Sequence, residues 1–506
     1  MRWAVWKLLE QPGAPGQGIL AFVTNHGFVW NRVHCGIRKA LLDAFDEIWV
    51  FNLHGNRRLA SREVLDENVF VPVKQGIALS VFVRRPGPHL GPARVHYREM
   101  RGRRAEKYAA PQETRLAGPG WTDVTPEAPY WSFAPSGPDD RYGSWPSIRE
   151  VFPVSNSGVQ TQRDDLVSDT DRGALLARMR QLTDRSLAAT ELRQQLSIPE
   201  NTQWRLDRQR SAFAPFEEAR ALPWLYRLFD RRLVYWDPEM MGRARESLMR
   251  HLLPEAFGFG GQRRRALVVQ RGRPITTIAT MTRGIATSDV TGYWCHVYPL
   301  HLATGFVEGL LLPQEETWTE NLEPDLAARL LDRYGLAVGV EQVADYVFGV
   351  LSAPAYRRRF AADLAIDHPH VPFPADAGVF ERMQSLGAEL AAAHLLEAPV
   401  STDIRFEGEG TNAVERPRHD ESTATVWINR NQRFTGVPAE AWAWGGAFRP
   451  LEHYLEDRRG RTLDLDQIEA YQRAIHAVRE AIRLEPLLDE QLARILAAPL
   501  DFRSAA

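Results

Sequence analysis

Runs of consecutive apolar residues near the N-terminus predict β-strands that are covered on both faces. These strands are expected at residues 18–24, 47–53 and 76–83, with a possible fourth at 93–97. Apolar residues recur at helical spacing between Val33 and Phe45, and residues 3–10 favour a short helix. That order predicts the later half of a doubly wound α/β sheet that closes in a hairpin.

The segment 99–201 carries little strand signal, because proline residues from Pro111 onward interrupt any regular element. Interspersed aromatic residues are typical of a loop that packs against a domain. Apolar residues at helical spacing then predict a helix over 174–195. The pair Asp164-Asp165 ahead of it favours helix capping and dipole complementation, with a metal site as the alternative.

The remainder of the chain mixes helix and strand signals. Strands are predicted at 266–271, 275–280 and 424–429, with the strand pattern continuing through 434–438, 442–446 and 451–461. Helices are predicted at 322–335, 343–351, 380–396 and 468–482. We therefore expect a mixed α+β region after the sheet, in parts that span 1–110, 111–201, 202–320, 321–400 and 401–506.

Composition permits several domains but does not by itself indicate a nucleic-acid partner. The 506 residues are 44% hydrophobic and 25% charged, which suits about two to four soluble domains. The net charge of -2 means that any DNA affinity must come from local clustering. Nearly all basic residues are arginine, which suits phosphate and guanine recognition but fits the coding bias of a GC-rich genome equally well.

Cysteine usage and hydropathy indicate the compartment. Cys35 and Cys295 lie far apart, which argues against a disulfide scaffold and a cysteine-ligated zinc site and favours a reducing cytoplasm. No apolar run approaches the ~20 residues of a membrane span, so a cytoplasmic protein without a membrane partner is expected. His368, His370 and His394 suggest a metal, but their spacing favours structural histidines.

Arginine clusters supply the candidate DNA-binding residues. The block at 224–251 interleaves aromatic side chains with Arg227, Arg231, Arg232, Arg243 and Arg245. Clustered guanidinium groups neutralise phosphates, whereas the alternative is an arginine-rich hairpin that forms surface ion pairs with the acidic residues of the same block. Gln270 and Arg271 follow a predicted strand and are able to read adenine and guanine edges. Asn429 and Arg430, at the end of a later strand, complete the candidates.

Three ordered blocks of sequence resemble one known family. Residues 18–85, which include GNRR at 55–58 and DENVFVPVKQG at 66–76, resemble the segment after the catalytic motif of bacterial adenine-N6 DNA methyltransferases. The closest group is the large, single-chain, type ISP-like restriction-modification proteins. The block that opens with Tyr226 resembles the start of their target-recognition region, with Leu228 in place of the usual proline. The third block, 424–461, resembles the end of that region, with Ala447 in place of a tyrosine.

The resemblance implies DNA target recognition and, in the intact family, methylation of adenine N6 by S-adenosyl-L-methionine (AdoMet). Family members carry a Gly-rich AdoMet loop and an Asn-Pro-Pro-Tyr motif upstream of the segment seen here, and neither motif occurs in this chain. We therefore expect no catalytic, cofactor-binding or metal-binding residue, and no bound cofactor for this chain alone. The expected partners are double-stranded DNA and a separately encoded AdoMet-binding half. The alternatives are a non-catalytic specificity subunit and an inactive, truncated gene product.

Overall fold

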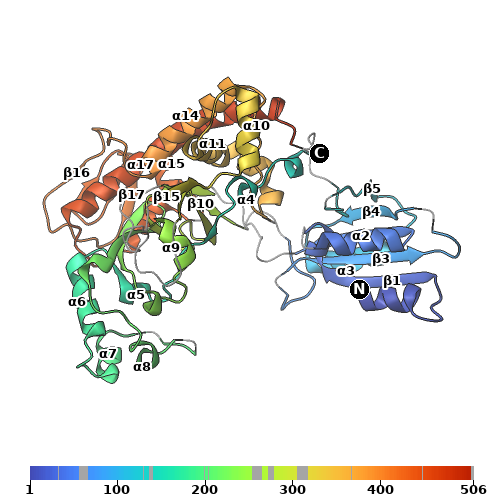
Figure 1. Cartoon of the computed structure of the whole chain (residues 1–506), viewed down its shortest axis with the longest axis horizontal. Helices are drawn as coiled ribbons and strands as arrows, with labels where there is room; N and C mark the ends of the chain where they lie inside the picture. The colour runs from blue at the N-terminus through green and yellow to red at the C-terminus, as the bar shows by residue number, and fades with distance from the viewer. Residues whose placement is uncertain are drawn as a thin grey trace. The chain divides into compact units, whose positions relative to one another are not determined.

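The computed structural model of the chain forms two compact units, Met1–Asp140 and Arg141–Ala506, here called unit 1 and unit 2 (Figure 1). The structure describes residues 1–31, 34–55, 66–73, 75–89, 91–128, 130–135, 141–198, 200–202, 204–252, 265–271, 278–304, 317–365, 367–446 and 448–502. No helix within these ranges is long and apolar enough to cross a membrane.

Unit 1 is built on one five-stranded sheet. Its strands are β1 (Gly18–Asn25), β2 (Glu47–His54), β3 (Ile77–Arg84), β4 (Arg94–Glu99) and β5 (Thr122–Val124), in the order β1-β3-β2-β4-β5. Strand β3 runs antiparallel to both β1 and β2, and β4 runs parallel to β2. All four strands predicted for this region are confirmed, and β5 is an additional strand that the sequence pattern did not indicate.

Helices cover both faces of this sheet, which explains the consecutive apolar runs. The helical elements are α1 (Arg2–Val5), a π-helical turn (Trp6–Glu10), α2 (Cys35–Ala44) and α3 (Arg104–Glu113). Val50 packs in one buried cluster with Leu41 of α2, whereas Phe51 packs in a second cluster with Ala110 of α3. The expectation that Pro111 breaks any helix is wrong, because Pro111 lies in the last turn of α3, where one missing N–H leaves the earlier turns intact.

Strand β1 is an edge strand with an apolar, exposed face. It pairs only with β3 in the described sheet, and its residues alternate between half-buried and exposed. Ile19 and Val23 are 67% and 56% exposed, and the nearby Trp3 is 70% exposed. An unpaired edge with large exposed apolar residues is unusual in a soluble sheet, because it invites pairing with another strand.

Unit 2 contains several small sheets that share one apolar core. The first sheet has the order β11-β10-β13-β6, formed by β6 (Asn156–Ser157), β10 (Ala266–Gln270), β11 (Ala279–Thr282) and β13 (Cys295–Pro299). The second has the order β12-β8-β9-β7, formed by β7 (Ser168–Asp169), β8 (Ala221–Arg227), β9 (Asp230–Tyr235) and β12 (Ile285–Ala286). Smaller sheets consist of β14 (His301–Thr304) with β15 (Thr317–Glu320), and of β16 (Phe406–Glu407), β17 (Arg418–Asp420), β18 (Thr425–Trp427) and β19 (Arg433–Phe434).

Long helices pack against these sheets (Figure 1). They are α10 (Pro324–Tyr334), α11 (Val340–Ser352), α14 (Ala377–His394) and α17 (Leu465–Ala497). Helices α11 and α14 approach closely at two glycines: a Cβ on Gly387 would lie 1.9 Å from the Asp345 carbonyl oxygen, and one on Gly349 would lie 2.9 Å from Met383 Sδ. Only glycine permits backbones to approach this closely at the crossing.

Short helices complete unit 2. They are α4 (Ile148–Val151), α5 (Asp164–Val167), α6 (Arg172–Thr183), α7 (Ala189–Gln195), α8 (Leu206–Gln209), α9 (Glu246–Leu252), α12 (Pro354–Arg359), α13 (Ala361–Leu364), α15 (Ala439–Ala443) and α16 (Pro450–Glu456).

Three predicted elements of unit 2 are wrong. The strand pattern expected at 442–446 is instead the end of helix α15 and a turn. The single helix expected over 174–195 divides into α6 and α7, because Asp184 ends α6 and its carboxylate accepts hydrogen bonds from the Ser186 N–H and hydroxyl. The segment 451–461 was expected to continue the strand pattern, but its first residues belong to helix α16. Pro450 occupies the first turn, and Leu451, Tyr454 and Leu455 are buried at helical spacing.

Candidate nucleic-acid interface

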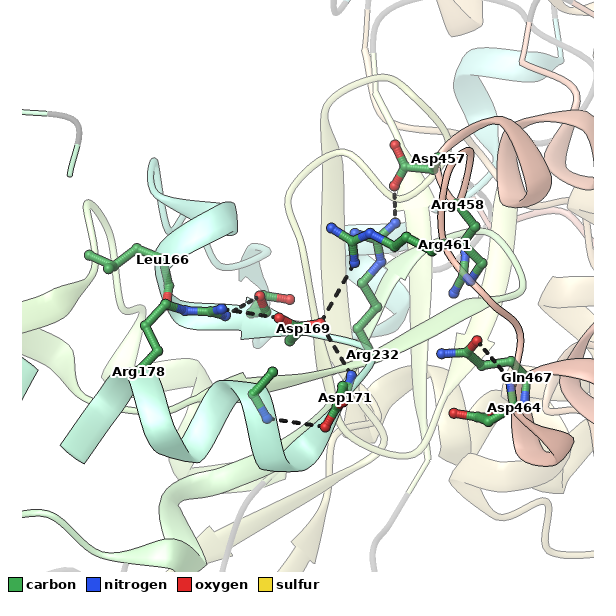
Figure 2. Close-up of polar contacts among 12 residues, drawn as sticks. Leu166, Asp169, Asp171, Arg178, Arg232, Asp457, Arg458, Arg461, Asp464 and Gln467 are labelled. Atoms are coloured by element: carbon green, nitrogen blue, oxygen red, sulfur yellow. Dashed lines mark hydrogen bonds and ion pairs between the residues drawn. The ribbon is translucent and has the colours of Figure 1, made fainter. Parts of the chain in front are cut away.

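The β8–β9 hairpin holds an ion-pair network at its centre. The Asp230 carboxylate is 2% exposed and accepts hydrogen bonds of 2.7 Å from both Arg232 and Arg458. Burial opposes ionisation of Asp230, but the guanidinium groups of Arg458 and Arg232 outweigh it and hold the pKa of this carboxyl below its usual value. Arg232 also pairs with Asp457 (Figure 2). The network therefore ties the hairpin to the C-terminal part of unit 2.

The other two hairpin arginines are also engaged within the protein. Arg227 donates to Asp289 Oδ1 at 3.1 Å and lies over the Tyr226 ring, 4.2 Å from its centroid. Arg231 donates from Nη2 to the Leu395 carbonyl at 2.5 Å. Only Arg232 therefore pairs with an acidic residue of its own block, as the ion-pair alternative predicted. Arg227 and Arg231 are held by a carboxylate and a carbonyl from other segments, so all three guanidinium groups contribute to the fold.

A second group of ion pairs lies beside this hairpin (Figure 2). Asp169 of β7 forms an ion pair with Arg178 of α6 at 3.1 Å and lies 3.7 Å from Arg461. Arg178 also donates from Nε to the Leu166 carbonyl at 2.7 Å. These arginines join β7, α6 and the segment after α16, so they too stabilise the fold.

Arg243, Arg245 and Arg271 differ from the hairpin arginines. Among the residues that the structure describes, the Arg243 and Arg271 side chains are exposed and form no hydrogen bond or ion pair. Arg245 is partly buried with a left-handed backbone (φ 58°), and its Nε is buried without a described partner. Burial, and then the positive charge of Arg243, lower the pKa of Arg245. An unpaired, repelling pair of guanidinium groups is able to bind an anion.

The remaining DNA-binding candidates also divide into residues that are engaged within the protein and residues that are not. Gln270 is 4% exposed, and its Oε1 accepts a hydrogen bond from Thr291 at 2.8 Å. Asn429 holds a turn, since its Oδ1 accepts the N–H groups of Asn431 and Gln432. Arg430 is exposed on that turn and has no described partner. The geometry thus favours structural roles for Gln270 and Asn429, while DNA contact by any of the candidates stays a prediction.

Histidine and arginine side chains from several segments form a cluster around β13 that the sequence did not indicate as a group. His296 and His368 lie edge to face with ring centroids 4.8 Å apart, and the Tyr298 hydroxyl and His368 Nδ1 share a hydrogen bond of 2.9 Å. Burial, and then the charges of Arg271, Arg149 and Arg245, lower the pKa of His296 to about 4. Sheet pairing brings these residues together from distant segments, so no local pattern identifies them.

The residues considered for a metal site occupy structural positions. His394 is fully buried, which lowers its pKa to about 3, and its Nδ1 shares a hydrogen bond of 3.0 Å with Thr280. His370 Nδ1 lies 2.6 Å from the Trp145 carbonyl. Asp164 opens α5 and accepts a hydrogen bond from the Thr161 hydroxyl. Within the described ranges, no group of three potential ligands is arranged to hold a metal ion.

Nearly the whole chain resembles three solved DNA complexes in fold, two of which contain Type ISP restriction-modification enzymes. A nuclease-deletion mutant of the Type ISP restriction-modification enzyme LlaGI, in complex with a DNA substrate mimic, shares 18% identity with a TM-score of 0.60 over 94% of this chain and 46% of its own. The DrdV-DNA complex shares 21% identity with a TM-score of 0.64 over 96% of this chain and 51% of its own. The ATP-dependent Type ISP enzyme LlaBIII bound to DNA shares 17% identity with a TM-score of 0.64 over 94% and 33%.

Residues 150–486 match the family described as the Type ISP C-terminal specificity domain, and the chain belongs to this family. The match covers well over half of the sequence and lies entirely within unit 2. This chain spans about half or less of the length of the solved relatives. No curated protein matches it. The predicted relation to the specificity region of Type ISP enzymes is therefore confirmed.

Proposed function

We propose that unit 2 recognises a target site in duplex DNA on behalf of a restriction-modification or phage-defence system. The observation that carries this proposal is the set of unpaired arginines, Arg243, Arg245 and Arg271, on a domain of a specificity family. Guanidinium groups without internal acidic partners are available to neutralise phosphates. The DNA-bound state of the three solved relatives supports the same function.

Binding of the full chain to labelled duplexes tests this function directly. We expect micromolar or tighter binding to a mixed-sequence duplex at low salt, with an affinity that falls steeply as salt is raised. A pool of random duplexes, enriched over several rounds of binding, should then converge on one motif. Absence of any salt-dependent binding to duplex DNA would contradict the proposal.

For unit 1 we propose the later half of an adenine-N6 methyltransferase sheet. The order β1-β3-β2, with an antiparallel strand between two parallel ones, supports this proposal together with the sequence resemblance. The described residues do not fit AdoMet. At the carboxyl end of β1, where such sheets bind cofactors, the His26 ring fills the space, and a Cβ on Gly76 would lie 2.4 Å from it.

A segment that carries the Gly-rich loop and the Asn-Pro-Pro-Tyr motif would therefore have to supply the AdoMet site. The free edge of β1, with Ile19 and Val23 exposed, is the place where its strands would join the sheet. Calorimetry should detect no AdoMet binding to this chain alone. Co-expression with such a segment should raise the soluble yield and give adenine methylation. If the two neither co-purify nor methylate DNA, the split-enzyme account fails and a free-standing DNA-binding module becomes the better account.

A further inference from the structure

Two histidines of unit 2 present buried nitrogen atoms that have no hydrogen-bond partner in the described structure. These atoms are His296 Nδ1 and His368 Nε2. His368 is 4% exposed, and burial, followed by its neighbour His296 and by Arg271, lowers its pKa to about 4. A neutral His368 that accepts the Tyr298 hydroxyl proton at Nδ1 carries its own proton on Nε2. An unsatisfied buried donor is costly unless a ligand or water completes it.

Backbone pairing places arginines from three further segments around this histidine pair. The Arg271 N–H donates to the Trp294 carbonyl at 2.8 Å, two residues before His296. The Ile148 N–H donates to the Pro369 carbonyl at 2.8 Å, which sets Arg149 beside His368. Ser157 of β6 pairs with His296, and three residues further along the chain Gln160 forms an isolated bridge with Arg243, two residues before Arg245.

Charge around the pair is strongly one-sided. The Arg149 and Arg271 side chains are exposed without a described partner, and Arg245 Nε is buried without one. The carboxylate that acts on His368 is Asp367, which already accepts a hydrogen bond of 2.8 Å from the His368 backbone N–H. Three guanidinium groups repel a metal cation and attract an anion. The ligand that fits this cluster is therefore an oxyanion with several acceptor atoms.

We propose that Arg149, Arg245, Arg271 and His296 bind a single backbone phosphate of duplex DNA, with His368 completing the donor set. This inference rests on the proposed DNA-binding function and adds Arg149, His296 and His368, none of which was a DNA-binding candidate from the sequence. The arginines supply the charge, and the neutral imidazoles supply N–H donors, so the two kinds of residue contribute differently to binding. A phosphate contact of this kind fixes the position of the protein on the duplex and is insensitive to base sequence.

The test is the salt dependence of binding between the full chain and a fluorescein-labelled mixed-sequence duplex. Arg149→Ala combined with Arg271→Ala should lower the slope of log K against log salt by about one, since the arginines share one phosphate, and each single variant should lower it by less. Arg149→Lys should restore the slope, since the charge returns. His296→Gln should weaken binding several-fold with an unchanged slope, because the group that it removes is uncharged. The control is Arg208→Ala on α8, an exposed arginine without a described partner, which should leave binding unchanged.

The outcomes separate the two proposals. If wild-type chain binds the duplex but the slope is the same in the combined Arg149→Ala and Arg271→Ala variant as in wild type, the phosphate site is wrong and the DNA-binding function stands. If the wild-type chain does not bind duplex DNA at all, both fail. Thermal unfolding of the arginine variants should match that of wild type, because the exposed arginines make no described contact; a lowered midpoint in Arg149→Ala or Arg271→Ala would assign them a structural role instead.

Discussion

The β8–β9 hairpin and the surroundings of β13 both concentrate arginine, but they use it differently. In the hairpin, Arg232 and Arg458 close on the buried Asp230 carboxylate. Around β13, Arg149 and Arg271 reach solvent without a described acidic partner. Both regions are rich in arginine, but only the arginines around β13 keep their charge available to a ligand. An internal carboxylate or carbonyl partner thus marks a structural arginine, whereas an arginine without one keeps its charge available to a ligand.

The largest expected effect comes from breaking the hairpin network. Asp230→Asn leaves Arg458, whose side chain is 2% exposed, without a counter-charge, and should lower the free energy of unfolding by about 3–5 kcal/mol. Urea denaturation at neutral pH measures this loss. Glu218→Gln is the matched control, because its partner Arg180 is 57% exposed and such surface pairs contribute about 0–1 kcal/mol. Equal effects in the two variants would remove the distinction between buried and exposed pairs.

The same carboxylate predicts a pH dependence of stability. The folded-state pKa of Asp230 lies below its unfolded value, which is about 3.9. Its contribution is therefore fully present above the unfolded pKa and is lost as pH falls through the folded pKa. The stability difference between wild type and Asp230→Asn should be constant from neutral pH down to about 5 and should shrink in more acidic solution. Denaturation curves at a series of pH values test this, and a gap that widens on acidification would contradict it.

A smaller effect should distinguish the two arginine groups in DNA binding. Arg243→Ala with Arg245→Ala should lower the salt slope by about one, since Arg245 shares its phosphate with Arg149 and Arg271, and should affect stability little. Arg232→Ala should do the reverse, since Arg232 pairs with Asp230 and Asp457. Fluorescence anisotropy and thermal unfolding of the same preparations give both quantities. A reduced salt slope in a folded Arg232→Ala variant would indicate that the hairpin contacts DNA after all.

The smallest expected effect is at Arg430. It is exposed on the turn that Asn429 holds, and it has no described partner. Arg430→Ala should change stability by less than about 0.5 kcal/mol. If this turn meets the DNA backbone, the variant loses about one unit of salt slope. An unchanged slope would limit the interface to the surroundings of β13.

Sequence patterns identified those parts of the fold that local hydrophobicity determines. The strands of unit 1 were predictable because helices cover both faces of the sheet and leave continuous apolar runs. The break at Asp184 was missed because one side chain that bonds to Ser186 decides it. The helix that begins at Pro450 was missed because a short amphipathic segment fits both periodicities.

The candidate site was less accessible to sequence reasoning, because partners distant in the chain decide it. From the sequence, the hairpin arginines were candidates for DNA contact. In the structure Arg232 pairs with Asp457, which lies 225 positions away in the chain. The sequence did offer one of the partners of Arg232, because Asp230 lies two positions before it. The cluster around β13 depends on the pairing of Ser157 with His296 and on the bond between Ile148 and Pro369. Neither contact leaves a periodic trace in the sequence.

The close crossing of α11 and α14 sets a limit on how this protein can be re-engineered. With Gly387 against the Asp345 carbonyl, any larger side chain would force the two helices apart. Mutagenesis libraries designed to change the recognised site should therefore leave this crossing intact and vary the loops around β13 and the turn at Asn429. If a variant at Gly349 or Gly387 loses DNA binding, the loss would indicate misfolding and would carry no information about which DNA sequence is recognised.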